Sequence, residues 1–149
     1  MKKRLRWISV LLICLTFISA FDVNVFADTD SSSGVTPRYN NVAVVYTVAT
    51  VSDSGVLSIV NNYEGVKGVV TRAVITTYIH KKVLGLFWSK VDIGQTDDEW
   101  VVNSYDYSYY GSITFQLPSK GTYRITSDYV VFGTGGAADT ITCQVQKTY

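Results

Sequence analysis

The stretch LPSKGTYRI, residues 117–125, places a tyrosine two residues after a glycine, at the start of a run with the composition of a β-strand. Pro118 and Gly121 interrupt strand pairing, because proline has no amide hydrogen to donate and glycine favours turns. Tyr123 then stands where a tyrosine corner is expected, in which the hydroxyl of a tyrosine near the start of a strand bonds to backbone a few residues upstream. We therefore expect Tyr123 to be structural and to help close two β-sheets on each other.

Short runs rich in valine, isoleucine, threonine and tyrosine lie on both sides of this corner. Turn residues separate the runs, and no stretch after residue 38 keeps the apolar period of a helix. Seven strands are predicted, at residues 42–51, 56–61, 69–80, 88–93, 105–117, 123–132 and 140–147. Without helices to connect parallel strands, this pattern predicts one all-β antiparallel sandwich over residues 39–149, and about seven strands with a tyrosine corner are typical of an Ig-like sandwich.

The first 27 residues have the order of a secretory signal peptide, which we expect to be helical. Four basic residues precede a short apolar run at residues 8–18, and Val25-Phe26-Ala27 offers a cleavage site before Asp28. The run is shorter than the about 20 apolar residues that span a bilayer. Residues 28–38 (DTDSSSGVTPR) are polar and predict a flexible N-terminal segment. We expect a secreted, extracellular protein; loose association with the cell surface and a retained N-terminal anchor stay open.

Removal of this leader changes the charge and the cysteine count that apply outside the cell. Of the 13 basic and 12 acidic residues the leader takes four and one, which leaves a net charge of −2. Because the remaining chain is nearly neutral and has no basic cluster, no nucleic-acid partner is expected, and membrane contact is expected only through an uncleaved signal. Cys143 is then the one cysteine left, so no internal disulfide can form. It alternates with Ile141 and Val145, which predicts a structural, buried side chain, with a reactive thiol or an intermolecular disulfide as the alternative.

The residue types that usually carry catalysis or bind metals form no recognisable motif. His80 is the only histidine and is expected in a solvated turn; one histidine cannot supply a multi-histidine zinc site, and no triad is apparent around it. The acidic residues 97–99 predict a solvated loop, with a weak calcium site that includes Asp92 left open. The glycine-rich residues 133–136 predict a hairpin turn. We expect no enzyme activity, no metal and no cofactor, although a hydrolase with a carboxylate pair stays as an alternative.

The stretch WVVNSYDYSYYG, residues 100–111, is rich in aromatic side chains. Flat amphipathic rings bury area at low entropy cost, so glycan- and protein-binding surfaces use them. An unbroken strand would point the odd-numbered tyrosines at the core, whereas a bulge at Gly111 would expose them, and both readings stay open. The candidate ligand-binding platform comprises Trp88, Trp100, Tyr105, Tyr107 and Tyr109.

Several short motifs also carry a resemblance. The leader ends in V-F-A-D, Arg38-Tyr39 begins the domain, a Ser-Asp-Ser-Gly turn occupies residues 52–55, Trp88 follows the third predicted strand, and Gly-Thr-Tyr-Arg opens the sixth at residues 121–124. On these features residues 38–149 resemble uncharacterised small secreted β-sandwich proteins of Gram-positive bacteria, of the Ig-like or fibronectin-type-III-like kind. The resemblance implies a sandwich and an extracellular setting, and it brings no activity and no site residues.

These observations together predict a secreted, non-catalytic β-sandwich that serves as a binding module for a surface glycan or a surface protein. A secreted antibacterial or pore-forming protein is the main alternative, because the alternating strand at residues 71–78 could insert into a bilayer as part of a hairpin.

Overall fold

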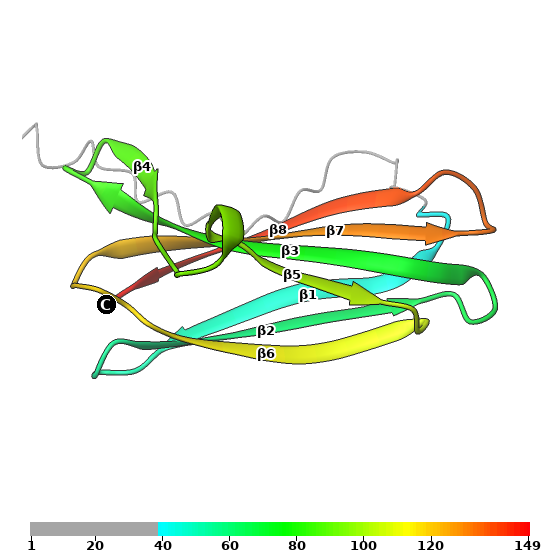
Figure 1. Ribbon diagram of the computed structural model, residues 1–149, viewed down its shortest axis with the longest axis horizontal. Helices are drawn as coiled ribbons and strands as arrows, with labels where there is room; N and C mark the ends of the chain where they lie inside the picture. The colour runs from blue at the N-terminus through cyan, green and yellow to red at the C-terminus, as the bar shows by residue number, and fades with distance from the viewer. Residues whose placement is uncertain (1–38) are drawn as a thin grey trace, which may run out of the picture. The chain divides into compact units, whose positions relative to one another are not determined.

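Strands make up most of residues 39–149, the part of the chain that the computed structural model describes (Figure 1). They are β1 (Val42–Val51), β2 (Val56–Gly65), β3 (Val70–Val83), β4 (Phe87–Lys90), β5 (Trp100–Ser104), β6 (Ser108–Gln116), β7 (Thr122–Gly133) and β8 (Asp139–Thr148). A 3₁₀ helix, Thr96–Asp98, follows β4, and no helix in residues 39–149 is long and apolar enough to cross a membrane. The predicted signal peptide (residues 1–27) and the predicted N-terminal segment (residues 28–38) both fall outside the described residues.

The strands form two antiparallel sheets, which Figure 1 shows as two layers. Sheet A has the order β1-β2-β6, and sheet B has the order β4-β3-β7-β8. β5 also pairs with β3, opposite residues 73–77, whereas β4 pairs with residues 80–83. The predicted all-β class and the antiparallel pairing are confirmed.

Strand boundaries differ from the predicted ones between residues 87 and 108. β4 ends at Lys90 and not at residue 93, and β5 is a strand that the sequence pattern did not reveal. β6 begins only at Ser108, because residues 105–107 carry the chain from sheet B to sheet A. Within β6 the predicted alternation is confirmed, since Ile113 and Phe115 pack on the core while the residues between and beside them are exposed.

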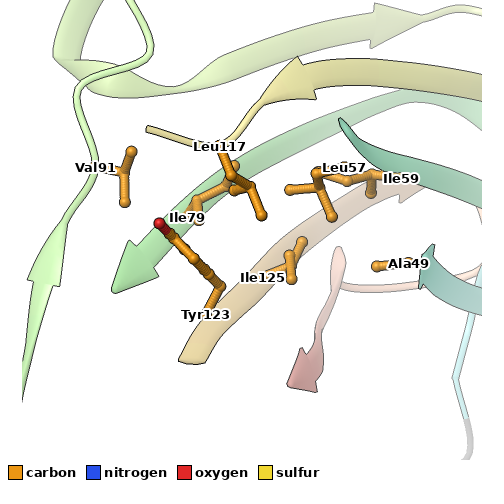
Figure 2. Packing of buried hydrophobic residues seen from close by; sticks show 8 residues of the cluster. All are labelled: Ala49, Leu57, Ile59, Ile79, Val91, Leu117, Tyr123 and Ile125. Atoms are coloured by element: carbon orange, nitrogen blue, oxygen red, sulfur yellow. The ribbon is translucent and has the colours of Figure 1, made fainter. Parts of the chain in front are cut away.

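Two apolar clusters fill the space between the sheets. The first surrounds Tyr123 (Figure 2) and consists of Ala49, Leu57, Ile59, Ile79, Val91, Leu117, Tyr123 and Ile125. The second consists of Val42, Tyr63, Ala73, Ile75, Tyr129, Val131 and Ile141. Because each cluster joins side chains of sheet A to side chains of sheet B, apolar burial holds the two layers face to face.

Tyr123 also closes the crossing from β6 to β7. Its ring is completely buried, and its hydroxyl donates a hydrogen bond to the backbone oxygen of Ser119. This is the bond of a tyrosine corner. The Leu117 N–H donates to the oxygen of Gly55 (3.0 Å), and Gly121 exchanges two backbone bonds with Tyr149 (3.0 and 3.1 Å). Both ends of the crossing are therefore tied to neighbouring parts of the domain.

A set of polar side chains is buried between the sheets as well. The Asn61 amide donates to Thr77 Oγ1 (2.8 Å), the Thr77 and Ser127 hydroxyls are hydrogen-bonded (3.0 Å), and Ser127 donates to Asn61 Oδ1 (2.9 Å). We call these three residues the polar ring. Thr47 donates to the same Asn61 oxygen (2.9 Å) and is hydrogen-bonded to the hydroxyl of Tyr129 (2.8 Å). The ring links β2, β3 and β7 through groups that satisfy one another, so its burial carries little desolvation penalty.

Asp139 fastens the start of β1 to the start of β8. Its carboxylate accepts the backbone N–H groups of Asn40, Asn41 and Val42, at 2.9, 2.6 and 3.0 Å. The buried Asn41 side chain in turn donates to the backbone oxygens of Val131 and Ala137. Several charge-assisted donors on one carboxylate compensate its burial.

Candidate binding surfaces

Two of the five predicted platform residues face the interior. Trp100 packs on the first apolar cluster and meets the ring of Phe115 edge-on, with ring centroids 5.7 Å apart. Tyr109 is half-buried against the second cluster, and its ring stacks with Tyr63 at 6.5 Å and 16°. The tip of Tyr109 lies over Gly111, where a Cβ would come within 2.0 Å of the tyrosine hydroxyl. The absence of a side chain at Gly111 therefore makes room for the ring.

The other three are not part of this interior packing, and they occupy two separate places. Tyr105 and Tyr107 are exposed in the connection from β5 to β6, where the ammonium of Lys67 lies 5.7 Å from the Tyr107 ring centroid. Trp88 is half-buried on β4, which belongs to the other end of β3. The structure thus does not bring the five side chains together into one platform.

Of the two readings left open, the bulge at Gly111 is wrong, because β2 and β6 pair without a register shift from Val56↔Gln116 to Glu64↔Ser108. Tyr105 and Tyr107 are exposed for a different reason. They precede β6, which begins at Ser108, so the alternation of that strand does not include them. Tyr109, the first tyrosine inside the strand, follows the alternation and turns inward.

The outer face of sheet A carries two further aromatic residues, which are not among the five predicted from the sequence. Tyr46 on β1 is opposite Asn62 on β2, and Asn62 is opposite Tyr110 on β6. The two tyrosines are 41% and 70% exposed. Two strand spacings separate them, about 10 Å. Tyr110 could have been found from the sequence, because it shares even parity with the outward residues of the same strand.

This face is nearly uncharged. Exposed Val44 and Val48 flank Tyr46, and hydroxyl side chains line β6 on the same side. Glu64 is the one charged residue among the outward positions of β1, β2 and β6. Aromatic rings beside amide and hydroxyl groups on a flat, weakly charged surface suit a ligand that is itself uncharged, with apolar faces and hydroxyl edges.

A second exposed region is the hairpin formed by β3 and β4. In Figure 1 this hairpin rises away from the rest of the two layers. Val83 pairs with Phe87, and the turn between them exposes Leu84 and Leu86. Behind the tip, the guanidinium of Arg124 and the ammonium of Lys82 lie 4.6 and 5.9 Å from the centroid of the Trp88 ring. The hairpin therefore combines an apolar tip with a cationic, aromatic base.

His80 is half-buried in the middle of this base and not in a solvated turn, so that expectation is wrong. It lies within β3, directly opposite Lys90 on one side and Arg124 on the other. Burial, and then the charges of Arg124 and Lys90, lower the pKa of the imidazole below its usual value. Its ring contacts Tyr78 edge-on at 5.4 Å. The turn does not form at His80 because β3 continues to Val83, so His80 lies inside a strand that is paired on both edges.

The acidic residues 97–99 serve local structure. Asp98 accepts the N–H of Ile93, and Glu99 forms an ion pair with Lys90 at 2.8 Å. Asp92, which the sequence linked to a weak calcium site, accepts the N–H of Gly94. Among residues 39–149 no three histidine, cysteine, aspartate or glutamate side chains gather closely enough to hold a metal ion.

The remaining two candidates are the glycine-rich stretch and the cysteine. Residues 133–136 connect β7 to β8, and the Gly135 N–H donates to the side chain of Asn41, so the stretch is a hairpin connection fixed by the N-terminal end of β1. Cys143 is a free thiol, half-buried beside the second apolar cluster, and burial raises its pKa.

No family model and no curated protein matches the chain. The function assigned below therefore depends on the surfaces themselves.

Proposed function

We propose that this protein is a secreted, non-catalytic binding module with an Ig-like sandwich, and that it binds a surface glycan on the outer face of sheet A. Three features support the Ig-like assignment: β1, β2 and β6 share one sheet, β3, β7 and β8 share the other, and a tyrosine corner lies between β6 and β7. The order of charge and hydropathy in residues 1–27 supports secretion. The likeness to small secreted proteins of Gram-positive bacteria belongs to the same proposal.

The observation that carries the glycan assignment is the row Tyr46, Asn62, Tyr110 across three paired strands. The faces of sugar rings carry C–H groups that pack on aromatic rings, and sugar hydroxyls bond to amides. Two tyrosines about 10 Å apart match the length of a disaccharide, with Asn62 placed to bond the linkage region. Because both tyrosines project from paired strands, little conformational entropy is lost on binding.

The other classes have weaker support. For a hydrolase, the candidate base His80 lies between two cations, and the carboxylates of Asp98 and Glu99 are engaged by a backbone amide and by Lys90. For a pore-forming protein, residues 71–78 lie in β3, which pairs with neighbours on both edges. Their insertion as a hairpin would require both ladders to break.

The test measures retention of the protein on insoluble bacterial cell-wall polysaccharide and on mucin. We expect Tyr46→Ala and Tyr110→Ala each to weaken retention about tenfold, because each removes one stacking ring. Tyr105→Ala is the matched control, since Tyr105 is as exposed as Tyr110 but lies in the β5–β6 connection, off the face. Equal retention of all three variants, or no retention of the unaltered protein on any glycan tested, would contradict the proposal.

A further inference from the structure

We propose that the β3–β4 hairpin is a membrane-docking element that inserts its apolar tip into an anionic lipid bilayer. This surface is distinct from the outer face of sheet A, and the inference does not depend on glycan binding. It concerns residues 81–90 (KKVLGLFWSK) together with Arg124 of the neighbouring strand.

The tip of the hairpin exposes three large apolar side chains. Leu84, Leu86 and Phe87 are 84%, 82% and 54% exposed, and they are nearly consecutive. The tip protrudes from the two layers, as Figure 1 shows, so a deformable surface such as a bilayer can surround it. Contiguous exposed apolar side chains in a soluble domain mark an interaction site, and adjacent cations favour a lipid surface over an apolar protein groove.

The backbone at the tip strengthens this inference. Leu84 and Gly85 have φ angles of 52° and 70°, and the Leu86 N–H donates to the oxygen of Val83 (3.0 Å), which is the pattern of a type I′ turn. That turn strongly favours asparagine, aspartate or glycine at its first central position, because a larger side chain is strained at positive φ. Leucine at this position is strained by the positive φ angle, and it exposes an apolar side chain to water. Such a conflict is expected where the side chain serves a function.

Cations surround the base of the hairpin. Lys82 and Arg124 contact the face of Trp88, and within residues 39–149 neither forms an ion pair. Lys81 donates to the hydroxyl of Ser119, while Lys90 is neutralised by Glu99. Two uncompensated positive charges, those of Lys82 and Arg124, therefore lie against one aromatic ring, and Lys81 adds a third on the other face of β3. Such a group attracts anionic head groups, whose phosphates arginine and lysine bind well.

The spacing between tip and base matches the depth of interfacial insertion. Lys82 and Trp88 are directly opposite each other, two residues from Leu84 and from Leu86. At the rise of a strand, two residues span about 7 Å, and interfacial apolar segments are buried about 5–10 Å deep. Insertion of the tip would thus bring the cations to the phosphates and the Trp88 indole to the head-group layer, where tryptophan is enriched.

The experiment measures sedimentation of residues 37–149 with vesicles. This segment is one compact unit that contains all the strand pairings and both apolar clusters, and it lacks the apolar run at residues 8–18. One set of vesicles is phosphatidylcholine with one quarter phosphatidylglycerol, and the other is pure phosphatidylcholine. We expect binding to the anionic vesicles that weakens at high salt, and little binding to the neutral ones.

Leu84→Asn is the decisive variant. Asparagine suits the left-handed backbone, so the melting temperature should stay equal or rise, while removal of the apolar tip residue should weaken vesicle binding about tenfold. Lys82→Gln should weaken it about fivefold through loss of one charge. Val66→Ser, an exposed valine in the β2–β3 connection, is the control that should bind as the unaltered domain does.

Equal binding of Leu84→Asn and the unaltered domain would overturn the proposal, as would equal binding to both kinds of vesicle. Absence of vesicle binding, together with Leu84-dependent retention on cells that protease treatment abolishes, would assign the tip to a protein partner instead.

Discussion

Replacement of Asn61 by leucine tests the buried polar ring most directly. Leucine has the same number and branching of side-chain non-hydrogen atoms as asparagine, so Asn61→Leu removes the amide and places two somewhat larger methyl groups in the same positions. The amide makes four hydrogen bonds, to Thr47, Thr77, Ser127 and Tyr129. Each bond stabilises the fold by about 1 kcal/mol net.

Two pairings survive the substitution. Thr47 and Tyr129 can still bond to each other, and so can Thr77 and Ser127, but one hydroxyl of the second pair loses its acceptor. Burial of the leucine side chain recovers about 1.5 kcal/mol, which leaves a loss of about 2.5 kcal/mol in the free energy of unfolding. For a domain of this size the melting temperature should fall by about 10 °C.

Urea unfolding of residues 37–149, followed by tryptophan fluorescence, measures this loss. Asn103→Leu is the control: Asn103 lies exposed on β5, so its substitution should change the free energy of unfolding by less than about 0.5 kcal/mol. A loss below about 0.5 kcal/mol for Asn61→Leu, or a gain, would refute the reasoning. It would mean that an apolar interior serves the fold as well as the polar ring does.

Four further outcomes follow from the contacts described. Tyr123→Phe keeps the buried ring and removes only the corner bond, so urea unfolding should show a loss of about 1 kcal/mol; no loss would mean that the bond is dispensable. Asp139→Asn removes the charge that three backbone N–H groups share and should cost about 3 kcal/mol in the same assay, whereas an unchanged midpoint would argue against the fastening of β1 to β8. Burial raises the pKa of Tyr129 to about 12 from 10.0, so the unfolded state loses this proton first; stability from this group is complete below pH 10 and is lost as the pH rises toward 12. Between these values the unaltered domain should lose about 1 kcal/mol per pH unit more than Tyr129→Phe, and parallel curves would contradict this. Burial also raises the pKa of the Cys143 thiol, so a thiol reagent such as dithionitrobenzoate should react slowly at neutral pH and rapidly in urea; fast reaction of the folded domain would show an accessible thiolate.

The fold followed from the sequence where turn chemistry and strand alternation agreed. The stretch around Tyr123 predicted the corner because Pro118 and Gly121 leave few other conformations, and the alternation in β6 and β8 placed Ile113 and Ile141 correctly. β5 could not be predicted, because its five residues are too few for alternation to stand out.

The candidate surfaces were harder to predict from the sequence than the fold, because each surface combines residues of several strands. The row of Tyr46 and Tyr110 exists only through pairing with β2 between them, and the cations at the hairpin base include Arg124, far along the chain from Lys82. The exposed tip could have been recognised, since the apolar stretch Val83-Leu84-Gly85-Leu86-Phe87 follows two lysines. Its exposure could not be predicted, because it depends on whether another part of the fold covers the tip, and nothing in residues 39–149 does.

The position of β6 has a consequence for the order in which the chain can assemble. β1 and β2 are joined by a tight turn and can pair early. Their apolar side stays exposed until β3 and β7 pack on it. The free edge of β2 pairs only with β6, which follows β3, β4 and β5 in the sequence. Closure of such distant partners is slow compared with formation of a local hairpin. A nascent chain that ends at residue 104 would therefore contain a β1–β2 hairpin with an unpaired edge and exposed apolar side chains. The native state can form only after nearly the entire polypeptide has been synthesised.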